Sequence, residues 1–388
     1  MKRVAVAYTQ NPADPAVYSG LTNGVMRGLR EIGIDPIPVV CGPQSERLRS
    51  ALIGLGSLRY LRPCGDSGFA SRSARRAASS LGMAEVNSWL GRDVLRRSGR
   101  LDGIIQIGPS FALSTDLPLV TYDDMTAIQA RNLGYPSWRL LSDRTLTRLI
   151  ARQRGLYETA TACCVATPWA FDSVVADYGV AAERVHVVGV GANFRAFGFG
   201  RDWSQPRFLF VGMDWERKNG EAVVRAFARL RRTVPNARLD VVGGHPRLSE
   251  AGVTGHGVLS PNNASHRRQL RALYTAATCL VVPSHAEAAG IVYVDAAAAG
   301  LPVIGSALGG AEFLIGEGGF VVRSGDDGAL LSAMIRLSNP VEARAFGGAA
   351  LRRSQLFTWA NVARRLVHAL RGALANDADW NEPGPAEW

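Results

Sequence analysis

The sequence predicts an α/β protein made of two domains. Short apolar runs rich in β-branched residues alternate with longer amphipathic stretches, an order typical of parallel βαβ units. The chain has 388 residues, which is enough for two domains of ordinary size. Each half begins with a strand, a loop and a helix, so we expect two similar Rossmann-like domains. The composition, 47% hydrophobic and 20% charged, excludes a disordered chain.

The first half opens with a strand, a polar loop and a helix that begins after Ser19-Gly20. Small residues at this point leave room for a ligand, although a loop that only needs space would look the same. The strands expected in this half are Val4–Tyr8, Ile37–Val40, Asp102–Ile107, Leu119–Tyr122, Ala162–Ala166 and Val185–Val188. The expected helices are Leu21–Ile32, Leu146–Ala160 and Trp169–Tyr178. The run Gly189–Asn193 is expected at the edge of the first domain.

The second half repeats the pattern from about residue 205 onward. Its expected strands are Phe208–Val211, Leu239–Val242, Leu280–Val282, Val303-Ile304 and Phe320–Val322. Its expected helices are Gly220–Leu230, Gln269–Ala276 and Ile291–Ala299, and a last amphipathic helix runs from Phe357 to about Ala373. The polar, proline-containing residues after that helix predict a tail.

The stretch from Pro283 to Glu312 carries the strongest functional signal. A buried strand ends at its start, Glu287 follows in a loop of small residues, and a helix begins at Ile291. Ligands of open α/β sheets bind beyond the carboxyl ends of the strands, and uncovered helix amides attract anions such as a diphosphate. Glu287 and Asp295 are eight residues apart, a spacing that would let both face one side of a helix. The pattern suits a ligand with phosphates and sugar hydroxyls, although βαβ units rich in glycine and alanine are common without one.

A pair of cations follows the first strand of the second half. Arg217 and Lys218 lie in a charged loop, and Lys218 is one of two lysines in the chain. A lysine point charge beside an arginine fork can clamp a diphosphate. The alternative is a solvated turn.

Two carboxylates, Asp123 and Asp124, follow the strand at Leu119–Tyr122. This end of a strand is where ligands bind. An aspartate there can instead cap the next helix, and the sequence alone does not separate the two interpretations.

The motif around Glu287 resembles the donor-sugar motif of retaining glycosyltransferases of family 4, which have the GT-B fold. The matching positions are Pro283-Ser284, Glu287, Gly290, Gly300-Leu301-Pro302-Val303, Gly309-Gly310, Gly212 and Lys218. Four features depart from the family pattern. Asp295 replaces a glutamate, and Ala288-Ala289-Gly290 replaces Gly-Phe-Gly. Met213 stands where the family has an arginine, and Ser19-Gly20 replaces Gly-Gly.

The resemblance implies two Rossmann-like domains that face each other across a cleft. Residues 1–197 would form the acceptor domain and residues 198–358 the nucleotide-sugar donor domain. A helix over 359–375 would cross back to the first domain, and 376–388 would be a polar tail. The implied activity is transfer of a sugar, as by a hexosyltransferase, from a nucleotide-diphosphate sugar to a glycan, lipid or small-molecule acceptor. The alternatives are a non-catalytic nucleotide-sugar-binding protein and a nucleotide-sugar epimerase.

The resemblance also implies the roles of the candidate site residues. Those expected to take part in catalysis are Glu287, Lys218, Arg217 and, near the sugar or acceptor, Asp124. Those expected to bind the donor are Gly20, Gly212, Arg217, Lys218, Ala288, Ala289, Gly290, Ile291 and Asp295. Glu287 would contact the sugar, and Asp295 the ribose. We expect no metal and no cofactor besides the donor substrate.

The net charge of +11 is concentrated between Arg47 and Arg100, where eleven arginines meet three acidic residues. Such a segment favours an anionic partner, for example a membrane surface, unless it is only a solvated basic face. No nucleic-acid-binding module accompanies it, so we expect no nucleic acid partner. The chain has no apolar run of the roughly 20 residues that a membrane helix needs. Its short first apolar run predicts a strand instead of a signal peptide, and we expect a cytoplasmic protein, peripheral at the inner face of the membrane.

Overall fold

The computed structural model describes residues 1–58, 80–135, 138–139, 141–195 and 200–372. The chain divides into two compact units. Unit 1 comprises residues 1–189 together with the chain from residue 362, and unit 2 comprises residues 190–361. The predicted tail at 376–388 and part of the basic segment, residues 59–79, lie outside the described residues.

Unit 1 contains a six-stranded sheet in the order β2-β1-β3-β4-β5-β6, and all its strand pairs are parallel. Its strands are β1 (Arg3–Tyr8), β2 (Asp35–Val40), β3 (Gly103–Ile107), β4 (Leu119–Asp123), β5 (Ala162–Val165) and β6 (Val185–Val187). The side chains of β3, β4 and β5 are buried along their whole length, which explains why these strands are mostly apolar.

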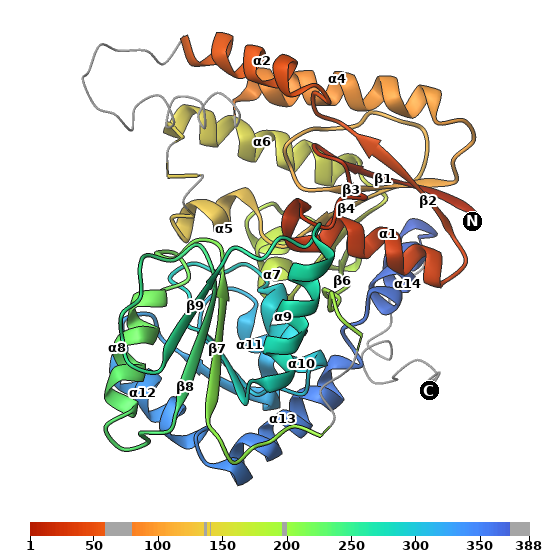
Figure 1. The fold of residues 1–388 in the computed structure, drawn as a ribbon. Coiled ribbons are helices and arrows are strands. Elements are labelled where there is room, and N and C mark those ends of the chain that lie inside the picture. The colour runs from red at the N-terminus through yellow and green to blue at the C-terminus, as the bar shows by residue number, and fades with distance from the viewer. Residues whose placement is uncertain (59–79, 136–137, 140, 196–199, 373–388) are drawn as a thin grey trace. The chain divides into compact units, whose positions relative to one another are not determined.

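Helices cover the sheet of unit 1 on both faces, with α4 and α6 side by side on one of them (Figure 1). The helical elements are η1 (Val17–Gly20), α1 (Leu21–Glu31), α2 (Glu46–Leu58), α4 (Leu81–Arg97), α5 (Ala127–Asn132), α6 (Asp143–Thr159), α7 (Pro168–Ala176) and η2 (Ala182–Arg184). Serines begin two of them. The hydroxyl oxygens of Ser80 and Ser142 accept hydrogen bonds from the backbone amides of Met83 and Thr145.

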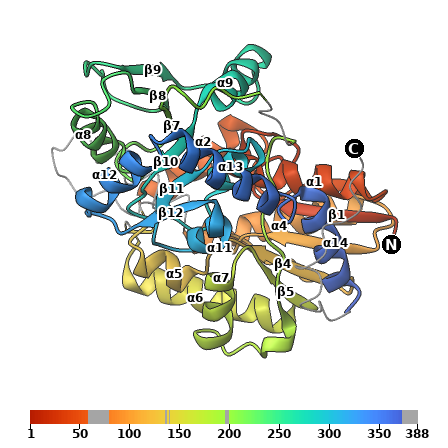
Figure 2. The same ribbon diagram turned by 90° about the horizontal axis from the view of Figure 1, so that it is seen from below.

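Unit 2 contains a second six-stranded parallel sheet, in the order β12-β11-β10-β7-β8-β9 (Figure 2). Its strands are β7 (Arg207–Gly212), β8 (Arg238–Gly243), β9 (Val253–Gly257), β10 (Cys279–Val282), β11 (Val303–Ser306) and β12 (Gly319–Val322). Its helical elements are α8 (Gly220–Leu230), α9 (Ala264–Ala276), α10 (Ile291–Ala298), α11 (Ala311–Ile315), η3 (Gly316–Gly318), α12 (Asp327–Arg336) and α13 (Pro340–Ser354). Helices α8 and α12 pack together on one face of the sheet, and α10 and α13 on the other.

The last helix, α14 (Trp359–Leu370), begins in unit 2 and continues in unit 1. In unit 2, the amide of Ala192 donates to the carbonyl of Phe357, just before the helix. In unit 1, Nη1 of Arg365 donates to the carbonyl oxygen of Val188 at 3.1 Å. Of the described helices, none is long and apolar enough to cross a membrane.

The predicted fold class is confirmed, since both units are Rossmann-like α/β domains. The sequence interpretation missed β9, α5, α12 and α13. Strand β9 has the sequence VTGHG, is only partly buried and carries no apolar run that would indicate a strand. Helix α9 begins at Ala264, five residues before the predicted start, because the side chain of Asn263 caps it.

The strand order reverses direction at one place in each sheet. In unit 1, β2 lies on one side of β1 and β3 on the other. In unit 2, β8 lies on one side of β7 and β10 on the other. Ligands of open α/β sheets bind beyond the carboxyl ends of the strands at such a switch point.

Candidate functional site

The loops that follow β7 and β10 bring three predicted site residues together at the switch point of unit 2. The ammonium group of Lys218 donates a hydrogen bond to Oε2 of Glu287. Both residues are buried, with 8% and 5% of their surface exposed. The hydroxyl of Ser284 also donates to Oε2 of Glu287, at 2.9 Å. The sequence interpretation did not assign Ser284 a role.

Arg217 joins the two loops. Its Nη1 donates to the carbonyl oxygen of Ala286 at 2.9 Å and lies 4.0 Å from Oε1 of Glu287. Its own carbonyl accepts a hydrogen bond from the amide of His285 at 2.7 Å. We call Arg217, Lys218 and Glu287 the charged cluster. Gly212, the last residue of β7, lies beside the side chain of Lys218.

The charged cluster keeps its carboxylate ionised. Burial acts to raise the pKa of Glu287, but the charges of Lys218 and Arg217 outweigh it and lower that pKa. Burial lowers the pKa of Lys218, and the charge of Glu287 opposes this change. The lysine charge is therefore largely compensated within the protein.

Gly309 gives the loop around Glu287 its space. A Cβ atom at Gly309, whose φ is +65°, would lie 2.0 Å from the carbonyl oxygen of Glu287. The amide of Gly310 donates to the carbonyl oxygen of Ala288 at 2.7 Å. The backbone of these two glycines therefore packs directly against the loop that carries Glu287.

Helix α10 begins directly after the charged cluster. Gly290 is its N-cap, with φ of +79°, and no side chain caps the helix. Ala288 and Ala289 are each 3% exposed, and Ile291 is 9% exposed. The first amides of α10 thus start where the loop of Glu287 ends, as the predicted anion site requires.

Asp295 lies in α10 and holds the segment that leads into unit 2. Its Oδ1 accepts from the backbone amide of Asn193, and its Oδ2 from Nδ2 of Asn193 at 3.3 Å. The prediction that Glu287 and Asp295 face one side of a helix is wrong, because Glu287 precedes α10 and is not helical. The ribose-binding role of Asp295 stays a prediction.

The two aspartates at the end of β4 take different partners in unit 1. Oδ1 of Asp124 accepts from the hydroxyl of Tyr18 at 2.6 Å, and Oδ2 of Asp123 accepts from the hydroxyl of Tyr157 at 3.0 Å. Neither caps the next helix, because Thr126 caps α5 in a capping box. Burial is the main cause that raises the pKa of Asp123 to about 7.

Gly20, also in unit 1, is the N-cap of α1 and follows two residues with unusual backbone angles. Tyr18 and Ser19 have φ of +50° and +55°, and Gly20 has φ of +84°. Left-handed backbone costs about 1–2 kcal/mol for a residue with a side chain. The third such non-glycine residue among those described is Asn219, which follows Lys218 in unit 2.

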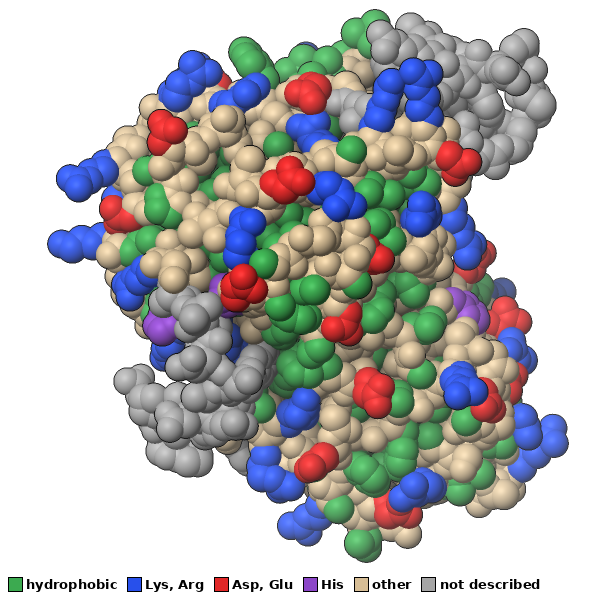
Figure 3. Space-filling model, turned by 180° about the vertical axis from the view of Figure 1, so that it is seen from behind, with side chains coloured by type: hydrophobic (Ala, Val, Ile, Leu, Met, Phe, Trp, Pro, Cys, Tyr) green, Lys and Arg blue, Asp and Glu red, His purple; other side chains and the backbone are tan. Residues whose placement is uncertain are grey.

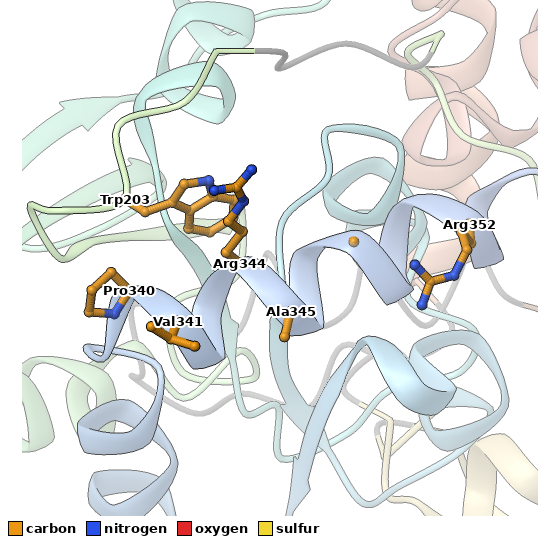
Figure 4. Close-up of a pocket in the computed structure, with 7 residues that line it drawn as sticks. Trp203, Pro340, Val341, Arg344, Ala345 and Arg352 are labelled. Atoms are coloured by element: carbon orange, nitrogen blue, oxygen red, sulfur yellow. The ribbon is translucent and has the colours of Figure 1, made fainter.

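A hollow of about 570 Å³ lies elsewhere on unit 2, beside α13 (Figure 4). Its lining residues are Trp203, Pro340, Val341, Arg344, Ala345, Gly348 and Arg352. None of the predicted site residues is among them.

Within the described parts of the chain, no group of three or more His, Cys, Asp or Glu side chains is arranged to hold a metal ion.

Comparison with known families identifies the part of the chain that carries the charged cluster. Residues 205–339 match the sequence model of the family "Glycosyl transferases group 1". These residues form a group 1 glycosyltransferase domain. The domain includes Arg217, Lys218, Glu287 and Asp295, whereas Gly20 and Asp124 lie outside it in unit 1.

The chain is also similar to curated proteins. D-inositol 3-phosphate glycosyltransferase 1 of Catenulispora acidiphila is 28% identical over 256 residues, 58% of this chain and 60% of that protein. D-inositol 3-phosphate glycosyltransferase of Corynebacterium aurimucosum is 28% identical over 292 residues, 67% of each chain. That of Mycobacterium leprae is 32% identical over 184 residues, 43% of this chain and 42% of the relative. The chain thus spans about 60% of the first of these relatives.

Solved structures share the fold over nearly the whole chain. Sucrose-phosphate synthase from Thermosynechococcus elongatus has a TM-score of 0.65 and 19% identity, covering 96% of this chain and 98% of its own. WaaG, a glycosyltransferase involved in lipopolysaccharide biosynthesis, has a TM-score of 0.61 and 17% identity, covering 95% and 100%. The chain therefore has the GT-B fold that its sequence motifs indicated.

Proposed function

We propose that the protein is a retaining glycosyltransferase that transfers a hexose from a nucleotide-diphosphate sugar to an acceptor. The observation that carries this proposal is the buried charged cluster at the switch point of the group 1 domain, directly before an uncapped helix. This arrangement suits a ligand that combines a diphosphate with a sugar. The names of the curated relatives also support sugar transfer.

The donor diphosphate would bind Lys218 and Arg217. During transfer, negative charge develops on the leaving diphosphate, and fixed cations and amides stabilise such charge. The backbone N–H groups from Ala288 to Ile291 would be these amides. The donor-binding role of Gly20 stays a prediction. Glu287 would accept hydrogen bonds from the transferred sugar.

The donor has to compete with contacts that already exist. Glu287 pairs with Lys218, and Arg217 lies 3.6 Å from Oδ2 of Asp214. The family's arginine position is occupied by Met213, which is 65% exposed and adds no charge. This reduced positive charge favours the second candidate, a nucleotide-sugar-binding protein without transfer activity.

The acceptor would be bound by unit 1, near Asp124. The family resemblance implies that this acceptor is a glycan, a lipid or a small molecule. D-inositol 3-phosphate, which appears in the names of the curated relatives, is the first acceptor to test.

Unit 1 would also associate with an anionic membrane surface. On α4, Trp89 is 58% exposed, and Arg92 and Arg96 follow at three and seven residues, so the three lie near one face of the helix. Leu48 and Leu55 of α2 are also exposed, at 49% and 65%. Exposed tryptophan and leucine beside arginine are typical of membrane-surface helices. On the view from behind, charges of both signs and apolar side chains are mixed (Figure 3).

Sedimentation with vesicles tests the membrane proposal. The protein should pellet with phosphatidylglycerol vesicles at low salt and not with phosphatidylcholine vesicles, and Trp89→Ala should weaken the binding. Val341→Ala, which removes an exposed apolar side chain of unit 2, is the matched control. Equal binding to both lipids, or none, contradicts the proposal.

A panel of UDP-, GDP- and ADP-sugars tests the activity. A donor that binds only the folded protein raises its melting temperature. With the donor found in this way, the anomeric configuration of the product should be that of the donor. Hydrolysis of the donor without acceptor separates the two candidates, because a binding protein without catalytic activity leaves the donor intact. An enzyme that inverts the anomeric centre contradicts the retaining mechanism.

A further inference from the structure

Three side chains of unit 1 lie together at its switch point and have no assigned joint role. Tyr8 is the last residue of β1, and Asp124 directly follows β4. Strand β3 lies between these two strands, and Gly108, which follows it, lies beside the ring of Tyr8. Tyr18, from the loop after β1, therefore reaches across the end of β3 to Asp124. We call Tyr8, Tyr18 and Asp124 the tyrosine platform.

The geometry of the platform is well defined. The rings of Tyr8 and Tyr18 are stacked, with centroids 5.5 Å apart and planes 9° from parallel. The hydroxyl of Tyr18 donates to Oδ1 of Asp124 at 2.6 Å, a short bond typical of an ionised acceptor. One hydrogen bond thus fixes the carboxylate, and one stack fixes the ring.

This arrangement requires a strained backbone. Tyr18 and Ser19 both adopt left-handed φ, and strained residues cluster at functional sites, where the surrounding structure holds them. Two hydrogen bonds fix the loop that leads into these residues. The side-chain amide of Asn23 donates to the carbonyl oxygen of Ala13 at 2.7 Å. The backbone amide of Val17 donates to the carbonyl oxygen of Asp14 at 3.1 Å.

The carboxylate of Asp124 disfavours a negatively charged group in direct contact with the platform. Burial is the main cause that raises the pKa of Tyr8 and Tyr18, and the carboxyl group of Asp124 raises the pKa of both further. The two tyrosines are half-buried, so each still offers surface to a ligand. A flat aromatic surface beside a carboxylate fits a ring that has both C–H groups and hydroxyl donors.

We propose that the tyrosine platform is a binding subsite for a neutral, hydroxyl-rich ring of the acceptor, such as a sugar or cyclitol ring. The ring would lie against the aromatic surface and donate a hydroxyl hydrogen bond to Asp124. Tyr18 is the positioning residue, because it holds the carboxylate at a fixed place. The proposal rests on the proposed transfer activity for its role in the reaction, but the binding itself is measurable without turnover.

Binding of myo-inositol and methyl glucoside by saturation-transfer difference NMR tests the subsite directly. Irradiation of aromatic protons should saturate the ring C–H protons of at least one probe. In Tyr18→Leu this transfer should fall roughly tenfold, as expected for loss of about 1.4 kcal/mol of binding free energy. Tyr18→Phe keeps the stack and should lose less. Absence of signal from every probe with the wild type overturns the proposal, as does an unchanged signal in Tyr18→Leu.

Kinetics separate this proposal from the proposed activity. Tyr18→Leu should raise the acceptor KM about tenfold, a larger change than any loss of donor affinity. Tyr178→Phe, which removes a buried hydroxyl that donates to Gln153 in the same unit, is the control and should leave the acceptor KM unchanged. Parallel loss of donor affinity in Tyr18→Leu would overturn the subsite. A wild type that neither binds nor hydrolyses any donor would instead overturn the proposed function.

Discussion

At the switch point of each unit, loops from different strands are joined, and the two units join them with different side chains. In unit 2 the loops after β7 and β10 meet through a buried ion pair, Lys218 with Glu287. In unit 1 the loop after β1 meets the end of β4 through stacked tyrosines and a hydrogen bond to Asp124. Both sheets have the same parallel architecture, so the difference lies in side chains placed on similar strands.

The comparison shows two ways to keep a carboxyl group inside a protein. Glu287 remains ionised because two cations lie beside it, whereas buried Asp123 has its pKa raised to about 7 and is mostly neutral below that pH. The three described non-glycine residues with left-handed φ all belong to the loops after β1 and β7. Backbone strain in this molecule therefore marks both switch points.

The largest expected effect comes from breaking the ion pair of unit 2. Lys218→Met leaves the buried carboxylate of Glu287 without its main partner and should destabilise unit 2 by about 3–5 kcal/mol. Adding Glu287→Gln should recover most of this loss, because the unpaired charge is removed. Hydrogen exchange under native conditions measures both variants unit by unit. If Lys218→Met alone is as stable as the wild type, the ion pair contributes nothing to the stability of unit 2.

The second effect concerns the pH dependence of unit 1. The pKa of Asp123 is raised from 3.8 to about 7 in the folded protein. The contribution of Asp123 to the unfolding free energy of unit 1 is therefore highest below about pH 4. It falls as the pH rises to about 7, in all by roughly 4 kcal/mol at 1.36 kcal/mol per pKa unit. Glu287 acts in the opposite sense, because its lowered pKa makes unit 2 lose stability as the pH falls.

Asp123→Asn should remove the loss of stability in unit 1 between pH 4 and about 7, when exchange is corrected for its intrinsic pH dependence. Asp116→Asn, at an exposed aspartate of the same unit, should retain the wild-type profile. The same pH profile in wild type and Asp123→Asn would mean that Asp123 titrates normally.

The third effect tests the support behind Glu287. Gly309→Ala places a Cβ 2.0 Å from a backbone oxygen, so the loop has to move. We expect about 1–3 kcal/mol of destabilisation and a loss of donor affinity in a thermal-shift titration. Gly325→Ala is the matched control, since it also has a positive φ but no atom within 4 Å. Gly325→Ala should lose only the stability that the backbone strain costs, and it should keep donor affinity. Equal donor affinity in both variants would show that Gly309 does not support the donor site.

The smallest effect restores the cation that the family pattern has beside Gly212. Met213 is 65% exposed, so Met213→Arg should change stability by no more than about 0.5 kcal/mol. It should raise donor affinity by roughly three- to tenfold, in line with one additional charge-assisted contact at an exposed site. Val341→Arg adds the same charge at a 76% exposed position on α13 and should not raise donor affinity. Equal effects of the two variants would indicate only a change in overall charge.

Periodicity and motif spacing predicted the fold class, nearly all strands and the residues of the charged cluster. These features depend on local patterns: buried parallel strands are continuous apolar runs, and loop residues directly after them lie at one edge of the sheet. The helix spacing assigned to Glu287 and Asp295 was wrong, because it did not take account of the predicted helix start at Ile291, which the structure confirms.

The tyrosine platform could not be predicted from the sequence. Tyr18 and Asp124 are 106 residues apart, and nothing local to either one indicates the hydrogen bond between them. The left-handed backbone of Tyr18 is held by tertiary contacts and opposes the usual preference of tyrosine. The contact of Asp295 with Asn193, 102 residues away, was missed for the same reason.

Hydrogen–deuterium exchange with UDP-, GDP- and ADP-glucose tests most directly whether the charged cluster is a donor site. With the matching donor, amide exchange should slow in the loop at 213–219 and in the segment 284–291, and the same donor should raise the melting temperature. Unchanged exchange in both segments at saturating concentrations of all three donors would contradict a donor site at Lys218 and Glu287.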